Sequence, residues 1–324
     1  MLHPLLWLLG LVLFVTAMPI ALALAALLSV AWPGPRRGLR LLAFGWLYLG
    51  LELLVMPIAL ASWLASGLGR RLQRPAFVAF HYRLFATVIG LLVRCGSSLF
   101  TLTVRRQPLQ LPDDQRPLLV LSRHAGPGDS MLMIHELFTV ARRRPRIVLK
   151  HTLQWDPMID LVFHRLPMRF VDPAAPQPRG QRAGIAELAR TMGAGDALLI
   201  FPEGRNVNPR RRHRAIERLR RAGREQAARR AERIRHLMPP RALGLQAALA
   251  ARPDLDVAVV AHAGLDDLHT VPALWRAVAR EKTLHRAWRT LPAACVPRDR
   301  RGQADWALAE WERMDAWVGA QRAA

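Results

Sequence analysis

Three histidines in this sequence stand five positions before an aspartate, a spacing at which a turn can bring an imidazole against a carboxylate. The three pairs are His124 with Asp129, His151 with Asp156, and His262 with Asp267. Such a pair can act in general base catalysis, where the carboxylate fixes the imidazole tautomer and the imidazole takes a proton from a hydroxyl. The spacing by itself does not select one pair over the others.

The first pair differs from the other two because residues 126–128 read Gly-Pro-Gly. Glycine and proline favour a tight turn, so we expect Asp129 to fold back toward the His124 imidazole. His151 is followed by Thr-Leu-Gln-Trp without a turn residue, and Asp267 belongs to an acidic pair typical of a plain surface. We therefore predict His124 as the base and Asp129 as its orienting carboxylate. A buried histidine with only a structural role is the alternative.

A second feature follows the apolar run 197–201, which leads into Pro-Glu-Gly-Arg at residues 202–205. A carboxylate at the carboxyl end of a strand is well placed to meet a ligand, and glycine allows close approach of the backbone. We expect Glu203 to position the hydroxyls of a substrate, Gly204 to permit close approach and Arg205 to face a phosphate. Glu203 as a residue favoured only at a helix N-terminus is the alternative.

Lys150 ends another apolar run, where it could bind a phosphate or simply end an edge strand. The two cysteines, Cys95 and Cys295, stand 200 residues apart in dissimilar contexts. They build neither a disulfide framework nor a cysteine metal cage. We expect no metal site.

Residues 122–129 and 201–204 resemble the His-four-residues-Asp and Phe-Pro-Glu-Gly blocks of the glycerophospholipid acyltransferase family. Residues 149–157 resemble the segment between those blocks, and residues 237–244 resemble a late Leu-Pro-Arg-x-x-Gly element. The resemblance covers about residues 118–260. It implies a membrane-bound O-acyltransferase that moves a fatty acyl group from a thioester to the hydroxyl of a lysophosphatidic acid-like lysophospholipid. The donor would be acyl-CoA or an acyl carrier protein thioester, as a co-substrate, with no separate cofactor.

The sequence departs from the family at two arginines that are expected to hold the phosphate of the acceptor. Pro173 and Asn206 stand in their places. Arg205, Arg179 and Arg182 could substitute, and an acceptor other than lysophosphatidic acid becomes plausible. The alternative enzyme is an acyl thioesterase that uses the same His124 and Asp129 with water in place of the lipid alcohol.

The elements that must hold these residues begin with two long apolar runs, 5–32 and 41–68, separated by a Pro-Gly-Pro break. Each run is long enough for a membrane span, so residues 1–72 predict a membrane helical hairpin that either spans or dips into one leaflet. The arginines that flank the hairpin weakly favour the cytoplasmic membrane, with the catalytic domain facing the cytoplasm. Residues 73–97 predict an amphipathic interfacial helix that is too polar and too short to span comfortably.

From residue 98 to residue 324, short apolar runs alternate with helical segments, which predicts an α/β domain. With the family resemblance, this implies a mixed, largely parallel sheet flanked by helices. Strands are expected at 99–104, 117–121, 146–149, 197–201, 255–261 and 284–289. Helices are expected at 131–142, 157–165, 180–192, 214–237, 244–251 and 304–321.

The chain carries a formal net charge of +23, and residues 205–241 hold 14 arginines and three glutamates. A helix of this kind could lie on anionic lipid, receive the phosphates of coenzyme A, or be a solvated face without a partner. A non-catalytic, membrane-tethered basic scaffold that binds anionic lipid or nucleic acid is the rival class of protein. Nucleic acid is the less favoured partner because the basic stretch has no aromatic residue on which bases could stack.

Overall fold

The computed structural model describes residues 3–31, 36–108, 111, 115–124, 126–172, 178–204, 208–266, 275, 278 and 280–323. The chain divides into two compact units. The first comprises Met1–Thr103, Leu153–Leu166 and Thr270–Lys282, and the second comprises Val104–Thr152, Pro167–His269 and Thr283–Ala324. The first unit therefore includes a segment from the middle of the predicted catalytic domain.

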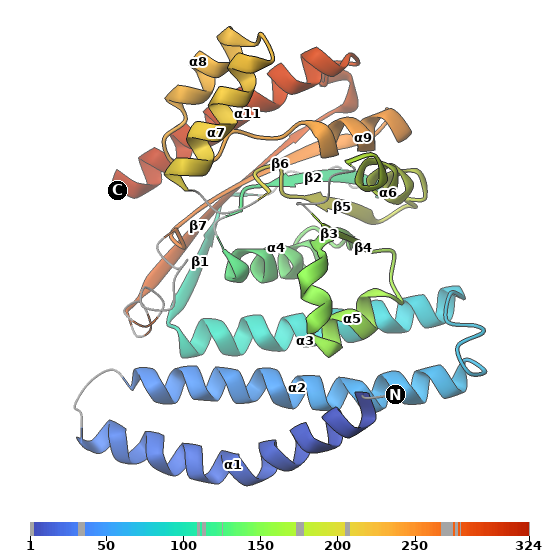
Figure 1. Ribbon diagram of the computed structural model, residues 1–324, viewed down its shortest axis with the longest axis vertical. Helices are drawn as coiled ribbons and strands as arrows, with labels where there is room; N and C mark the ends of the chain where they lie inside the picture. Colours follow the sequence, from blue (N-terminus) through green and yellow to red (C-terminus); the bar gives the residue numbers. More distant parts are fainter. Residues whose placement is uncertain are drawn as a thin grey trace. The chain divides into compact units, whose positions relative to one another are not determined.

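One seven-stranded sheet organises the second unit, in the order β1-β7-β6-β2-β5-β3-β4 (Figure 1). Strand β2 runs parallel to β5 and β6, and strand β3 runs parallel to β5 and β4. Strands β6 and β7 pair in the antiparallel direction. The predicted mixed, largely parallel sheet is thus confirmed. The strands are β1 (Leu102–Arg106), β2 (Leu118–Ser122), β3 (Arg144–Lys150), β4 (Arg169–Val171), β5 (Asp196–Ile200), β6 (Asp256–Ala263) and β7 (Lys282–Leu291).

Helices cover both faces of this sheet in the second unit. Helix α4 (Pro127–Thr139) lies on one face, and α6 (Pro178–Arg190), α9 (Leu243–Ala251) and α11 (Arg300–Ala323) lie on the other (Figure 1). The single helix predicted over 214–237 is wrong, because the chain forms α7 (Pro209–Arg221) and α8 (Glu225–Arg233) instead. Gly223 separates them with φ +68°, a left-handed conformation that glycine adopts readily and that ends helices.

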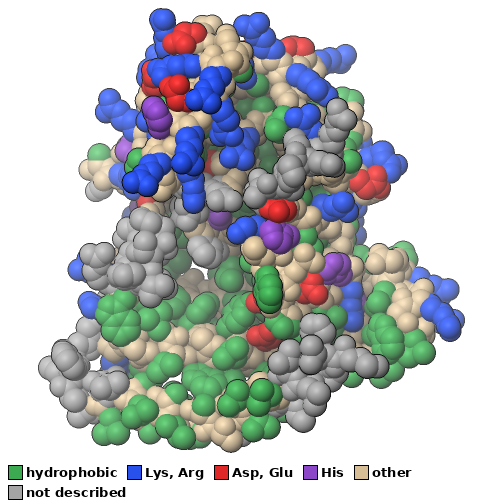
Figure 2. Space-filling model, in the orientation of Figure 1, with side chains coloured by type: hydrophobic (Ala, Val, Ile, Leu, Met, Phe, Trp, Pro, Cys, Tyr) green, Lys and Arg blue, Asp and Glu red, His purple; other side chains and the backbone are tan. Residues whose placement is uncertain are grey.

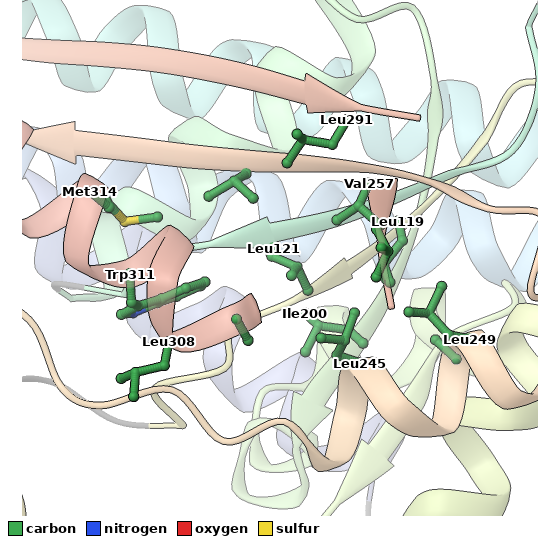
Figure 3. Close-up of a cluster of buried hydrophobic side chains, with 14 of the residues drawn as sticks. Leu119, Leu121, Ile200, Leu245, Leu249, Val257, Leu291, Leu308, Trp311 and Met314 are labelled. Carbon is green, nitrogen blue, oxygen red and sulfur yellow. The ribbon is translucent and has the colours of Figure 1, made fainter. Parts of the chain in front are cut away.

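The core of the second unit lies between the sheet and helices α9 and α11 (Figure 3). All five residues of β2 are buried, as expected for a central strand of a sheet that is covered on both faces. Leu119 and Leu121 of this strand share the cluster with Leu245, Trp311 and Met314. Burial of such side chains contributes about 1.5 to 3 kcal/mol each and holds the strand ends in place.

The first unit is built from three long helices, α1 (His3–Ala31), α2 (Arg37–Ala65) and α3 (Pro75–Leu99). By length and composition, Leu9–Leu27, Arg37–Ala65 and Pro75–Leu99 could each cross a membrane. Helix α3, with 25 residues, is thus long and apolar enough to span a membrane by length and composition. Its polar residues His81 and Tyr82 are buried, whereas Arg83 and Arg94 are exposed, so an interfacial position of this helix stays a prediction.

Hydrophobic side chains are exposed along α1 and α2, and Figure 2 shows them gathered over these helices. Leu9, Leu13, Leu54 and Leu60 are each more than half exposed, at 55 to 57%. Such exposed apolar side chains are compatible with membrane association, because their exposure to water is unfavourable.

Polar contacts hold the returning segment 153–166 within the first unit. Asp156 caps helix α5 (Pro157–Phe163) by accepting from the Ile159 N–H at 2.9 Å, and it also accepts from the Tyr48 hydroxyl. Arg165, just beyond α5, donates to the Ala59 carbonyl at 2.9 Å, and its Nη1 lies 3.0 Å from His81 Nε2. These contacts join α5 to α2 and α3.

Replacing Leu119 by Ala tests the packing of the central strand. Leu119 is fully buried, so we expect the cavity to cost about 2 to 5 kcal/mol and to lower the midpoint of thermal unfolding by about 10 °C. Circular dichroism of the detergent-solubilised chain measures that midpoint. Leu243→Ala removes the same atoms from a side chain that is 44% exposed, and it should change the midpoint little. Equal effects of the two substitutions would contradict the assignment of the core.

Candidate functional site

The carboxyl ends of three neighbouring strands form the centre of the site. Strand β2 lies between β5 and β6 and runs parallel to both, so their carboxyl ends meet at one edge of the sheet. Such an edge is where open parallel sheets place their ligands. His124 follows β2, the Pro-Glu-Gly corner at 202–204 follows β5, and His262 stands one residue before the end of β6.

The structure brings His124 and Asp129 together, with 3.3 Å between His124 Nδ1 and Asp129 Oδ1. The element that does so differs from the predicted turn. Helix α4 begins at Pro127, four residues earlier than predicted, and Asp129 lies in its first turn. Proline at the first helical position has the required φ angle and lacks only an N–H that would have no helical partner. The side chain of His124 keeps 25% of its surface exposed, whereas that of Asp129 keeps 1%.

The charges of this pair follow from its surroundings. Burial alone would raise the pKa of Asp129, but hydrogen bonds from His124 and His262 outweigh burial and hold that pKa well below its usual range. Burial would lower the pKa of His124, but Asp129 and Glu203 outweigh it and raise that pKa. Because Nδ1 faces an ionised carboxylate, we assign the proton of the neutral imidazole to Nδ1. His124 Nε2 then carries the free lone pair.

His262 provides a second imidazole on the same carboxylate. Its Nε2 lies 3.2 Å from Asp129 Oδ2 and 3.3 Å from the Arg123 carbonyl oxygen, so this nitrogen carries a proton. Its Nδ1 is buried without a hydrogen-bond partner among the described residues. Burial lowers the pKa of His262, although Asp129 opposes this effect. His262 is therefore neutral, and Asp129 accepts from a histidine on each side.

Arg123 locks the ends of β2 and β6 together. Its guanidinium is 1% exposed, donates to the His262 carbonyl and pairs with Asp266. The Arg123 N–H also donates to the Val260 carbonyl at 3.2 Å. Burial lowers the pKa of Arg123 to about 10, so the side chain stays charged at neutral pH.

Glu203 lies beneath His124 rather than in the open. The side chain is 2% exposed, and its Oε2 accepts from the Met238 N–H at 3.4 Å. The backbone N–H of His124 also donates to this carboxylate. The ring of Phe201, two residues earlier, lies 5.0 Å from the His124 ring. In this arrangement Glu203 supports the His124 backbone and also lines a hollow beside helix α7, so its expected role in positioning a substrate hydroxyl stays a prediction.

Gly204 completes the corner with φ +68°, and its N–H donates to the Phe201 carbonyl at 3.0 Å. This conformation is strained for other residues. The corner also holds a later segment, because the Arg241 N–H donates to the Pro202 carbonyl at 2.9 Å.

Of the other predicted binding residues, the two whose side chains the structure describes, Lys150 and Arg182, do not lie at this corner. Lys150 is exposed at the carboxyl end of β3, and Arg182 lines a separate hollow between α6 and α9. Arg205, Asn206 and Pro173 lie outside the described residues, as does the side chain of Arg179. Among the residues that the structure places, no group of three or more His, Cys, Asp and Glu side chains could hold a metal ion.

Sequence reasoning missed His262 as a partner of Asp129. It paired this histidine with Asp267, which lies outside the described residues. The available signal was its position near the end of a buried strand, but only the order of the strands shows that β6 adjoins β2. His151 and Asp156, which have the same spacing as His124 and Asp129, are not paired in the structure: His151 Nδ1 lies 3.6 Å from Asp172, and Asp156 bonds to Tyr48.

Comparison with known proteins adds two findings. Residues 103–260 match the family model described as Acyltransferase. The fold is similar to the crystal structure of the 1-acyl-sn-glycerophosphate (LPA) acyltransferase PlsC from Thermotoga maritima, with a TM-score of 0.57 and 15% sequence identity over 88% of this chain and 97% of that chain. No curated protein matches the sequence.

The buried Glu203 carboxyl predicts a pH dependence of stability. Burial raises its pKa from 4.5 to about 7, so the folded chain holds this proton at pH values where the unfolded chain has lost it. Its contribution to stability is complete below pH 4.5 and is lost as the pH rises to about 7. A glutamine at this position does not titrate. The free energy of unfolding of Glu203→Gln should therefore rise relative to that of wild type between pH 4.5 and about 7, and the difference should stay constant at higher pH.

This difference is measured from the thermal unfolding midpoints of the two proteins. The pH series begins below 4.5 and ends above about 7. Comparing the variant with wild type at each pH cancels the titration of the other groups. A difference that stays flat across the whole interval would contradict the raised pKa of Glu203.

Proposed function

We propose that the chain transfers a fatty acyl group from a thioester to the hydroxyl of a lysophospholipid, because residues 103–260 match the family model described as Acyltransferase. The contact between His124 and Asp129, at the edge where β2 and β5 end, carries this proposal. It supplies a base without a protein nucleophile beside it, which suits a reaction in which the substrate brings its own hydroxyl.

In the proposed reaction, the lone pair of His124 Nε2 takes the proton of the acceptor hydroxyl as the oxygen attacks the thioester carbonyl carbon. A new ester bond forms and the carbon–sulfur bond breaks. The imidazolium then returns the proton to the departing thiolate, which restores neutral His124. General base help of this kind is worth roughly 100- to 10,000-fold in rate.

Asp129 has two tasks in this scheme. It holds the Nδ1 proton of His124, which keeps Nε2 free, and it stabilises the imidazolium that forms during the reaction. His262 fixes the other carboxylate oxygen, so the plane of the carboxylate is held from both sides. Glu203 and Arg123 act as positioning residues beneath them.

The acceptor and the location are further parts of the proposal. The structural neighbour from Thermotoga maritima is named as a 1-acyl-sn-glycerophosphate acyltransferase, which supports a lysophosphatidic acid-like acceptor. Acyl-CoA or an acyl carrier protein thioester would be the donor. The exposed apolar surfaces of α1 and α2 support a membrane location, and we place the catalytic unit on the cytoplasmic side of the cytoplasmic membrane.

Replacing His124 by Ala tests the base. The variant should lose about 100- to 10,000-fold in kcat for transfer of labelled acyl groups from acyl-CoA to a panel of lysolipids, because no other group takes the proton. His164→Ala is the matched control, since His164 is an exposed imidazole 3.1 Å from its own aspartate, Asp160. Retention of activity within a few fold in His124→Ala would sink the assignment. Release of free fatty acid without a lipid product would indicate a thioesterase.

His262 predicts a shift in the pH dependence of the rate. Activity should rise with pH as His124 loses its proton, and Asp129 raises the pKa of that step above 6.5. Without the N–H of His262, Asp129 presents more of its charge to His124, so His262→Ala should move the rise to higher pH. His262→Gln keeps an N–H donor and should move the rise back toward that of wild type.

Profiles of kcat/KM against pH for the three proteins measure this shift. A merely structural role for His262 would lower the rate of His262→Ala and leave the midpoint of the rise where it is in wild type. That result would contradict the contact with Asp129.

A further inference from the structure

One side of helix α7 is lined by arginines at helical spacing. Arg211, Arg214, Arg218 and Arg221 follow one another at intervals of three, four and three residues, which places them on a single face of the helix. All four side chains are exposed. Figure 2 shows Lys and Arg side chains gathered over α7 and α8.

Two other arginines of α7, Arg212 and Arg220, hold the fold. Arg212 donates to the carbonyls of Ile234 and Glu232, which ties α7 to the end of α8. Arg220 bonds to Glu217 and Glu232. By contrast, the four arginines of the exposed face have no side-chain hydrogen bond or ion pair among the residues that the structure describes. Their charges are therefore not neutralised within this part of the chain.

These four arginines line a hollow of about 530 Å³. Arg241, Met238, Pro239 and Glu203 also line it. We call this feature the arginine hollow. Its volume falls within the range of small-molecule sites, about 300 to 1,000 Å³. Because Glu203 also supports the backbone of His124, the hollow adjoins the candidate active site.

The part of the lining outside α7 is held rigidly. Asp315 of α11 accepts from the N–H groups of Arg235, His236 and Leu237 at 2.9, 2.6 and 3.0 Å. The next N–H, that of Met238, donates to Glu203, and that of Arg241 donates to the Pro202 carbonyl. The hollow is therefore preorganised on this side, which lowers the entropic cost of binding.

We propose that the arginine hollow binds the phosphate monoester of a substrate. Several guanidinium groups that converge on one hollow suit a dianion, since each can donate two parallel hydrogen bonds to phosphate oxygens. Glu217, which also lines the hollow, is already bonded to Arg220 and does not cancel this charge. A concave site with a fixed wall suits a discrete phosphate better than the flat surface of a bilayer.

This inference rests on the proposed function for the identity of the ligand. Two substrates of that reaction carry a phosphate monoester: coenzyme A, on its ribose, and a lysophosphatidic acid-like acceptor. The arginines that the family resemblance leads one to expect at positions 173 and 206 are replaced by Pro173 and Asn206. The arginine hollow offers a replacement from another element, helix α7.

The test uses the double variant Arg214→Ala/Arg218→Ala of the full chain in lipid nanodiscs. Its control is Arg229→Ala/Arg233→Ala, which removes the same charge from exposed positions of α8 outside the hollow. Equilibrium binding is measured for coenzyme A against dephospho-coenzyme A, and for 1-acylglycerol 3-phosphate against 1-monoacylglycerol. Thermal midpoints confirm that both double variants are folded.

We expect wild type to bind one phosphorylated ligand at least tenfold more tightly than its dephosphorylated partner, and the control to keep this preference. The hollow variant should lose it. A preference within the coenzyme A pair assigns the site to the donor, and one within the glycerol pair assigns it to the acceptor. An unchanged preference in the hollow variant, no preference in wild type, or an equal loss in both double variants would overturn the proposal.

The binding measurement needs no turnover, so it separates this proposal from the proposed function. If the protein binds phosphate selectively but transfers no acyl group, the proposal for the arginine hollow is supported and the proposed acyltransferase function is rejected. If the hollow variant transfers acyl groups with unchanged KM values for both substrates, the acyltransferase function is supported and the proposal for the hollow is rejected.

Discussion

The candidate site depends on one buried carboxylate, that of Asp129, held between two imidazoles. A lone ionised carboxylate at this depth would be strongly unfavourable, and hydrogen bonds, above all those from the two histidines, keep it charged. The two histidines divide the work by exposure. The side chain of His262 is 1% exposed and stays neutral, whereas that of His124 is 25% exposed and can be reached from the solvent. The asymmetry of burial therefore decides which imidazole can take a proton.

This arrangement places strict demands on the fold around it. The two histidines come from adjacent parallel strands, so β2 and β6 must end in register, and Arg123 secures that register by bonding to the His262 carbonyl. Glu203, from the strand on the other side, supports the His124 backbone. Three strands are thus coupled through their polar ends, and the packed leucines of β2 supply the rigidity that such coupling needs.

Local sequence was sufficient where the determining interaction is local. Gly-Pro-Gly at 126–128 predicts the contact of Asp129 with His124, although the first turn of α4 makes it and not the expected tight turn. The alternating apolar runs predict six of the seven strands. Strand β4 was not predicted, because three residues are too few to show a periodic pattern. The contact of His262 with Asp129 was not predicted, because it depends on the order of the strands in the sheet, and no local sequence pattern contains that order. Of the polar residues behind the interfacial prediction for α3, His81 is turned inward to Ser62 and Arg165, whereas Arg83 and Arg94 are exposed, so that prediction stays untested.

The acidic groups near the site differ in how they are partnered. Asp129 and Asp315 are buried and accept hydrogen bonds from donors of the protein, whereas Glu203 is buried with one carboxylate oxygen, Oε1, that has no hydrogen-bond partner among the described residues. The arginines of the exposed α7 face lie at the surface and have no ion pair among the described residues. In the proposed arrangement they would attract anionic substrates by long-range electrostatics, while the proton chemistry would fall to one imidazole. Part of the arginine excess would then serve substrate binding beside the site, separate from the chemistry of His124.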